Sequence, residues 1–330
     1  MTDVTTEEAR GDGDLAGLRV LAVHAHPDDE SIWGGLALAN WVRRGADVSV
    51  VTCTLGEEGE VIGEKYADIV ADGYDILGGY RIAELQRALG ELGLGRPRFL
   101  GGPGRWRDSG MVGTPAAEHP CAFVNSGQTA VDQLAEIFDE LRPHVVVTYG
   151  PDGGYGHPDH IRAHEITHTA ADQAAQDAQD AHGGRWVPSR IYWTAQERER
   201  VEEGLRDLDS QGEPPQGWRR PEPGELATVP ARVVDARVEG SGEDLAAKRR
   251  AMAAHATQIW VADGSVSDVN DRPRIGRAGH AGTVAYCLSN LIAQPLLDTE
   301  SYTLAREFPA RGGVSQETVD RLDCLFAEGR

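Results

Sequence analysis

Residues 18–31 read LRVLAVHAHPDDES and join an apolar run to a short polar segment. The run from Leu18 to Val23 is typical of a buried strand, and Pro27 marks the break after it. Apolar residues with helical spacing then extend from about Ser31 to Arg44, and Asp47 to Cys53 forms a second apolar run. This order of strand, helix and strand favours a right-handed crossover and therefore a parallel sheet.

The same alternation of helical and strand patterns continues along the chain. The β-branched run from His144 to Tyr149 is a particularly clear strand. We therefore predict an α/β fold with a Rossmann-like, mostly parallel sheet that is flanked by helices. The other segments are predicted helices at residues 81–92, 128–141 and from about 161, and predicted strands at 98–100 and 190–194.

Local composition divides the chain into three predicted parts. Residues 1–17 are predicted to be a flexible leader, and residues 18–210 the catalytic α/β domain. A stretch rich in Pro and Gly near 212–224 marks the boundary. Residues 211–330 are predicted to form a smaller C-terminal α/β subdomain that completes the pocket. Within it, the polar segment 263–282 is predicted to be a mobile loop.

The composition excludes several classes of protein. The 330 residues include 53 acidic and 32 basic side chains, a formal net charge of −21, which argues against nucleic acid or an anionic membrane as partner. Nowhere do about 18 consecutive apolar residues occur, as a membrane span requires. The four cysteines form no CxxC pair, so neither a disulfide framework nor a thiolate metal site is indicated. We predict a cytoplasmic enzyme and leave its oligomeric state open.

Two polar segments follow predicted strands and contain the side chains of a metal site. In open α/β sheets the ligand crevice lies beyond the carboxyl ends of the strands, where residues 24–30 and 150–160 both fall. A catalytic zinc ion takes three protein ligands and leaves one position open. His26, Asp29 and His160 fit this pattern. We predict one Zn²⁺ per chain, with Fe²⁺ as an alternative, because mixed nitrogen and oxygen donors suit either ion.

Asp28 is the candidate general base. Neighbouring side chains on a turn point in different directions, so Asp28 cannot readily share the metal with Asp29. Its carboxylate is then free to accept the proton of an attacking water.

The second segment reads GGYGHPDH at residues 153–160 and supplies further catalytic candidates. His157 or Tyr155 can stabilise an oxyanion or protonate a leaving amine, and Asp159 is predicted to orient His157. Either segment alone is more often an ordinary polar turn, but the pair favours a metal site. His24 is predicted to lie behind that site or to be simply packed. The remaining histidines considered are predicted to be surface or helix residues: His164, His168, His182, His255 and His280.

The pair HPDD at residues 26–29 and HPDH at 157–160 resembles the LmbE/PIG-L family of zinc-dependent N-deacetylases. The resemblance implies activity on N-acetylglucosamine groups of glycoconjugates. It also implies the same roles as above, with His26, Asp29 and His160 as metal ligands and Asp28 as the base.

Four further segments resemble the branch of this family that acts in mycothiol biosynthesis. The resemblance implies a small-molecule substrate, N-acetylglucosaminyl-inositol, which loses acetate. It implies that Arg81 and Asp108 anchor the sugar and inositol, and that Glu60 and Met111 line the pocket. The segments are TLGEEGEVIG at 54–63, GGYR at 78–81, GRWRDSGM at 104–111 and RPHVVVTY at 142–149, with HATQ at 255–258 as a further likeness.

Two alternatives to the deacetylase remain at this stage. A sister amidase that cleaves mycothiol S-conjugates shares the metal residues and the bond type, but its likeness to the long segments above is poorer. A non-catalytic sugar-binding protein on the same fold needs neither a base nor an acid beside the metal. The presence of both Asp28 and His157 therefore favours an enzyme.

Overall fold

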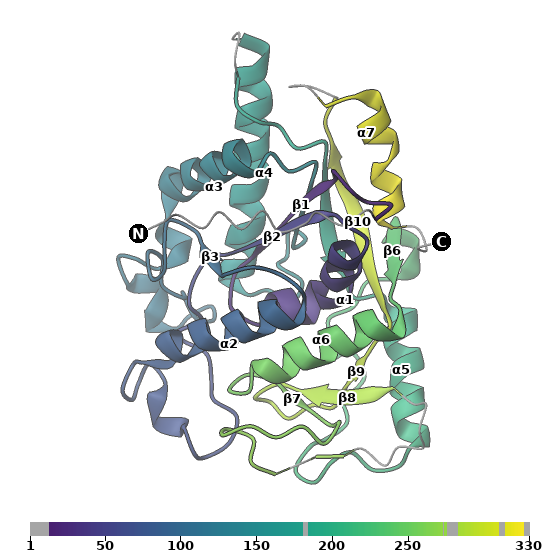
Figure 1. The fold of residues 1–330 in the computed structure, drawn as a ribbon. Coiled ribbons are helices and arrows are strands. Elements are labelled where there is room, and N and C mark those ends of the chain that lie inside the picture. The colour runs from purple at the N-terminus through teal and green to yellow at the C-terminus, as the bar shows by residue number, and fades with distance from the viewer. Residues whose placement is uncertain (1–12, 181–183, 273, 276–282, 310–313, 327–330) are drawn as a thin grey trace, which may run out of the picture.

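A seven-stranded sheet lies at the centre of the computed structural model, which describes residues 13–180, 184–272, 274–275, 283–309 and 314–326. The strand order is β3-β2-β1-β4-β5-β10-β6 (Figure 1). The strands are β1 (Arg19–His24), β2 (Asp47–Thr52), β3 (Arg98–Phe99), β4 (Val145–Thr148), β5 (Arg190–Ala195), β6 (Ala236–Glu239) and β10 (Thr299–Glu307).

The sheet is mostly parallel. The strands from β3 through β2, β1 and β4 to β5 run parallel, whereas β10 pairs antiparallel with both β5 and β6. All four residues of β4 are buried, as expected for a parallel strand that is covered on both faces. The predicted α/β fold with a mostly parallel sheet is confirmed.

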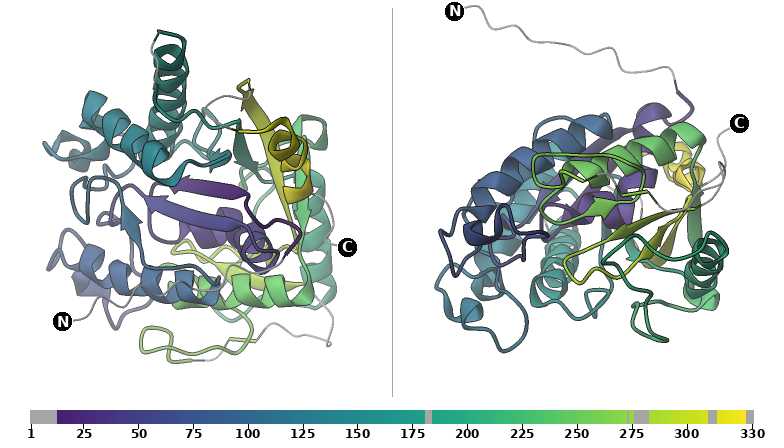
Figure 2. Two further views of the ribbon diagram at one scale, coloured as in Figure 1. Left: turned by 45° about the horizontal axis from the view of Figure 1, so that its top comes forward. Right: turned by 90° about the horizontal axis from the view of Figure 1, so that it is seen from below.

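Helices cover both faces of this sheet (Figure 2). Side chains alternate along β1, so Val20 and Ala22 join a core with α1, α2 and α6, while Leu21 and Val23 join a second core with α3 and α4. Among the described residues, no helix combines the length and apolar character that a membrane span needs. The helices are α1 (Asp29–Arg43), α2 (Leu77–Glu91), α3 (Gly127–Leu141), α4 (Pro158–Asp180), α5 (Arg198–Ser210), α6 (Gly242–Ala254) and α7 (Gln316–Asp320).

The C-terminal part is tied more closely to the main sheet than the predicted boundary at residue 210 implies. Strands β6 and β10 both follow that boundary and extend the sheet beyond β5, and α6 packs against α1 and α2. The smaller unit in this part is a three-stranded sheet of β7 (Trp260–Val261), β8 (Val284–Cys287) and β9 (Gln294–Leu296). Local composition marks a break in the chain, but it carries no signal for strand pairing across that break.

The end of the predicted leader belongs to the fold. Residues 1–12 lie outside the described residues. Leu15 belongs to the main core and is fully buried, and its amide donates to the carbonyl of Arg44 at 3.0 Å. Its apolar side chain is therefore part of the fold, in contrast to the prediction.

The predicted mobile loop contacts α2 and the segment before it. Asp268 accepts hydrogen bonds from the hydroxyls of Tyr66 at 3.0 Å and Tyr80 at 3.2 Å. Residues 273 and 276–282 of this loop lie outside the described residues, and its mobility stays a prediction.

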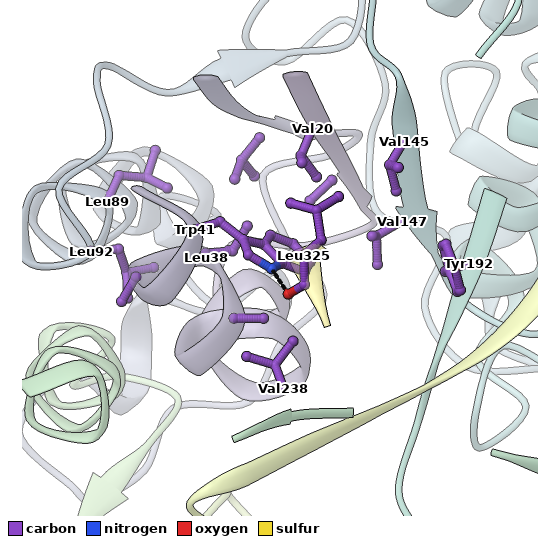
Figure 3. Packing of buried hydrophobic residues seen from close by; sticks show 14 of the residues in the cluster. Val20, Leu38, Trp41, Leu89, Leu92, Val145, Val147, Tyr192, Val238 and Leu325 are labelled. Atoms are coloured by element: carbon purple, nitrogen blue, oxygen red, sulfur yellow. Dashed lines mark hydrogen bonds between the residues drawn. The ribbon is translucent and has the colours of Figure 1, made fainter. Parts of the chain in front are cut away.

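Trp41 is a central side chain of the core between the sheet and α1 (Figure 3). It is 1% exposed, and its indole Nε1 donates to the carbonyl of Leu325 at 2.7 Å. Trp41→Ala is expected to lower the free energy of unfolding by about 3–5 kcal/mol, because it leaves a cavity in a packed core. Urea denaturation measures this change. Tyr74→Ala is the control, since Tyr74 is 73% exposed and a change within about 0.5 kcal/mol is expected. Equal losses in the two variants would contradict the prediction.

Candidate metal centre

The three predicted metal ligands meet at the carboxyl ends of β1 and β4. His26 follows β1, Asp29 is the first residue of α1, and His160 lies in the first turn of α4. Strands β1 and β4 are neighbours in the sheet, which brings these distant segments together. His26 Nδ1 lies 3.3 Å from His160 Nε2, and Asp29 Oδ2 lies 3.4 Å from each of these nitrogens. All three side chains are buried.

This spacing matches one face of a tetrahedral metal site. Zn²⁺ binds such donors at about 2.0–2.1 Å, and the edge of a regular tetrahedron is about 1.63 times its centre-to-corner distance, which gives about 3.3–3.4 Å. Two other groups, His26 with His157 and His160, and His26 with Asp108 and Asp159, have donor atoms within 4.8 Å of one another. The contacts with Asp108 and Asp159 use the opposite nitrogen of His26. The donor atoms of His26, Asp29 and His160 are therefore spaced to fit one metal ion, and their role as its ligands stays a prediction.

Asp159 orients His26, whereas the sequence predicted that it orients His157. Its Oδ2 lies 3.3 Å from His26 Nε2 and accepts a hydrogen bond from the amide of Ser109 at 2.9 Å. An Nε2–H that faces a carboxylate leaves Nδ1 unprotonated toward the metal. His157 lies two positions before Asp159 and just ahead of α4, and side chains at this spacing do not face each other.

Two groups orient His160. Its Nδ1 lies 3.0 Å from the carbonyl oxygen of Gly153, which leaves Nε2 for the metal. The ring of Tyr149 stacks on the imidazole with centroids 4.1 Å apart, and its hydroxyl accepts a hydrogen bond from the amide of Ala25 at 2.8 Å. Sequence reasoning missed Tyr149. The available signal was its place just after β4, at the same end of the sheet as the two motifs.

Gly153→Ala is expected to weaken metal binding by about 10- to 100-fold, because the substitution displaces a group that supports a ligand. Gly153 has φ +66°, and a Cβ there would lie 2.8 Å from the Cβ of His160. Competition with a chromophoric chelator measures the affinity. Gly156→Ala is the matched control, since Gly156 has φ +91° and a Cβ there meets nothing within 4 Å. Equal losses of metal affinity in the two variants would mean that backbone strain at a positive φ, and not the contact with His160, is responsible.

Asp28 precedes α1 in a strained backbone conformation. Its φ of 129° and ψ of −30° lie where residues other than glycine are rare, at a cost of about 1–3 kcal/mol. Its Oδ2 lies 3.0 Å from Nη2 of the buried Arg81. Burial raises the pKa of Asp28 to about 6, although the positive charge of Arg81 opposes this shift. A carboxylate with such a pKa can accept and return a proton near neutral pH.

His157 presents a neutral N–H donor beside the metal ligands. Its Nδ1 accepts a hydrogen bond from the amide of Asp159 at 3.1 Å, so the neutral ring carries its proton on Nε2. Burial lowers the pKa of His157 to about 3. The ring centroids of His157 and His26 lie 4.5 Å apart. Tyr155 is half-exposed, and its ring lies 5.0 Å from that of His160.

The sequence is similar to a known family and to named proteins. The model of the PIG-L family, described as GlcNAc-PI de-N-acetylase, matches residues 21–171. The chain is 52% identical over 310 residues to the 1D-myo-inositol 2-acetamido-2-deoxy-alpha-D-glucopyranoside deacetylase of Corynebacterium jeikeium, covering 89% of this chain and 93% of that protein. The chain belongs to the PIG-L family. It is therefore an N-deacetylase, and the predicted family is confirmed.

The chain is also similar to a second protein from the genus Corynebacterium. The protein of the same name from Corynebacterium diphtheriae is 52% identical over 298 residues, covering 90% of this chain and 96% of that protein. Among solved structures, a deacetylase of the teicoplanin biosynthetic pathway has 21% identity and a TM-score of 0.45, covering 87% of this chain and 98% of that one.

The four residues that the PIG-L resemblance predicts to bind substrate differ from one another in burial. The guanidinium of Arg81 is buried, and it donates to the carbonyl of Gly56 at 2.8 Å in addition to its pairing with the base. Asp108 is buried, and its Oδ1 lies 3.6 Å from His26 Nε2. Two side chains are exposed: Glu60 and Met111. Substrate contact by all four residues stays a prediction.

His255 was predicted to be a surface or helix residue, and this prediction was wrong. It is fully buried, and its Nε2 lies 2.7 Å from Oε1 of Glu30, which is also fully buried. The resemblance of residues 255–258 to the mycothiol branch of the family was the sequence feature that pointed to a role for His255. His24 is buried, as predicted, and its Nδ1 lies 3.3 Å from the hydroxyl of Tyr149. Among the others, two are half-buried residues of α4, His164 and His168, and two lie outside the described residues, His182 and His280.

Proposed function

We propose that this chain hydrolyses the acetamide of 1D-myo-inositol 2-acetamido-2-deoxy-alpha-D-glucopyranoside to acetate and glucosaminyl-inositol, a step of mycothiol biosynthesis. Relatives that bear the name of this deacetylase are about half identical to the chain over nearly their whole length. The observation that best supports this chemistry is the mutual approach of the donor atoms of His26, Asp29 and His160. Asp28 immediately precedes Asp29 in the chain.

The metal that we propose is one Zn²⁺ per chain, held by His26, Asp29 and His160, and Fe²⁺ is the alternative. The separations of 3.3–3.4 Å between the donor atoms support this choice. A bound divalent ion would polarise the acetamide carbonyl and lower the pKa of the attacking water.

Asp28 is the proposed general base, and the ion pair with Arg81 supports this role because it fixes the direction of the carboxylate. Asp28 accepts a proton as the water oxygen bonds to the carbonyl carbon. The proton then reaches the amide nitrogen as the C–N bond breaks, which releases acetate and the free amine.

His157 is the proposed oxyanion donor. Of the two roles predicted for it, the neutral Nε2–H supports donation to the negative oxygen more than it supports proton transfer. Tyr155 is the proposed donor toward the leaving nitrogen, because its half-exposed ring lies beside His157 and His160.

We further propose that Arg81, Asp108, Glu60 and Met111 contact the sugar and inositol, and that the C-terminal part completes the pocket. The contact of Gln258 Nε2 with the carbonyl of Glu60 at 2.9 Å supports the second statement. A guanidinium and carboxylates are apt partners of vicinal hydroxyls.

The experiment that tests this function is amine release from N-acetylglucosaminyl-inositol by protein that holds one equivalent of Zn²⁺. A mycothiol S-conjugate runs in parallel under identical conditions. Faster deacetylation supports the proposal, and faster cleavage of the conjugate assigns the amidase activity in its place. Absence of both activities would leave the proposed substrate without support.

A further inference from the structure

We propose that Glu30 and His255 are positioning residues that hold the backbone of Asp28 in its strained conformation and so aim the catalytic carboxylate. The inference rests on the proposed role of Asp28 as the base. It gives a positioning role to His255, a residue of the C-terminal part whose Nε2 contacts Glu30 rather than Asp28 or a proposed metal ligand.

Glu30 connects directly to the backbone of the base. Its Oε2 accepts a hydrogen bond from the amide of Asp28 at 3.0 Å. A residue with a side chain keeps a φ of 129° only when its surroundings enforce it. The hydrogen bond from the Asp28 N–H to Glu30 is such a constraint, because it fixes the peptide plane between Pro27 and Asp28. The direction of the Asp28 carboxylate toward Arg81 depends on that plane.

His255 in turn fixes Glu30. The carboxylate of Glu30 is fully buried, and a buried carboxylate needs partners for its oxygens. Oε1 lies 2.7 Å from His255 Nε2 and accepts a hydrogen bond from the hydroxyl of Ser31 at 2.6 Å. The other nitrogen of His255 has no hydrogen-bond partner among the described residues. The buried imidazole is thus directed at Glu30.

The contacts of the neighbouring Thr257 provide a control that distinguishes a positioning role of His255 from a packing role. Thr257 lies in the same turn as His255 and is also fully buried. Its amide and hydroxyl donate to Glu84 at 2.9 and 2.6 Å, which anchors the turn to α2. Neither Thr257 nor Glu84 contacts Glu30 in these bonds. Thr257→Val therefore removes an anchor of the turn without removing the chain of contacts to Asp28.

The test is a double-mutant cycle between Glu30→Ala and Asp28→Ala in zinc-loaded protein. Glu30→Ala alone is expected to lower kcat by about 10- to 100-fold with KM changed less than about 3-fold, since a small displacement of a catalytic group has effects of this size. In the Asp28→Ala background the same substitution is expected to lower kcat less than about 2-fold, because no carboxylate remains to be aimed. Glu30→Gln keeps an oxygen acceptor for the Asp28 amide and is expected to restore most of the rate.

Zinc content and melting temperature are measured for every variant. Thr257→Val is expected to lower the melting temperature while kcat stays within about 2-fold of the parent. If Glu30→Ala does not fold, His255→Ala takes its place in the cycle with the same expected pattern.

Equal losses in the two backgrounds, or a loss in Thr257→Val as large as in Glu30→Ala, would overturn the positioning role. An inactive parent protein, or full activity of Asp28→Ala, would instead overturn the proposed function and this inference with it.

Discussion

Removal of the bound metal with a chelator is expected to lower amine release by at least about 10³-fold, and one equivalent of Zn²⁺ is expected to restore it. Without the ion, water at neutral pH lacks the activation that brings its pKa from about 16 to about 7. The three donor atoms, 3.3–3.4 Å apart, are spaced for one ion. Reconstitution with Fe²⁺ or Co²⁺ under anaerobic conditions compares the specific activity of each ion per metal bound.

Substitution of a ligand tests the same site without a chelator. His160→Ala is expected to lose both the bound metal and the activity, because two protein ligands remain. His168→Ala is the matched control, since His168 lies two turns further along α4 and its Nε2 accepts a hydrogen bond from Trp193. Its metal content is expected to equal that of the parent protein. Full metal content in His160→Ala would show that a different set of ligands holds the ion.

The sequence predicted the parallel part of the fold well because each strand there is a short apolar run that ends at a polar loop. Strand β4, with all four residues buried, is the clearest example. The pairing of β10 with β5 was not predicted, since Tyr302 and Thr194 face each other across more than a hundred positions with no local signal for partner or direction. An antiparallel strand such as β10 pairs with an edge that forms only when the sheet folds, and a local sequence pattern does not describe that edge.

The convergence of the proposed metal ligands was predictable for a related reason. Parallel strands end at one edge of the sheet, so two motifs that each follow a strand converge there. The partners of the ligands were less predictable, because they depend on side-chain direction. Asp159 faces His26 across the site, and Glu30 meets a histidine 225 positions away. A sequence motif does not show in which direction a side chain points or which distant residues lie near it in the fold.

Asp28→Asn is expected to lower kcat by about 10²- to 10⁴-fold with bound zinc retained, because it removes a general base without removing a ligand. Asparagine has nearly the same shape, and its side-chain oxygen can still accept a hydrogen bond from Arg81, which lies 3.0 Å from the carboxylate. The amide cannot accept the proton of the attacking water. KM is therefore expected to change much less than kcat, and steady-state kinetics with zinc analysis of the same samples measures both.

Asp75→Asn separates this chemistry from the loss of an ordinary ion pair. Asp75 also has a positive φ, 53°, and its carboxylate lies 2.8 Å from a guanidinium, that of Arg107. It shares with Asp28 a positive φ and an arginine partner, but it follows neither of the strands that precede the proposed metal ligands. Its kcat is expected to stay within about 2-fold of the parent value. A zinc-loaded Asp28→Asn protein with the parent rate would rule out Asp28 as the base, whereas loss of zinc from that variant would make Asp28 a ligand.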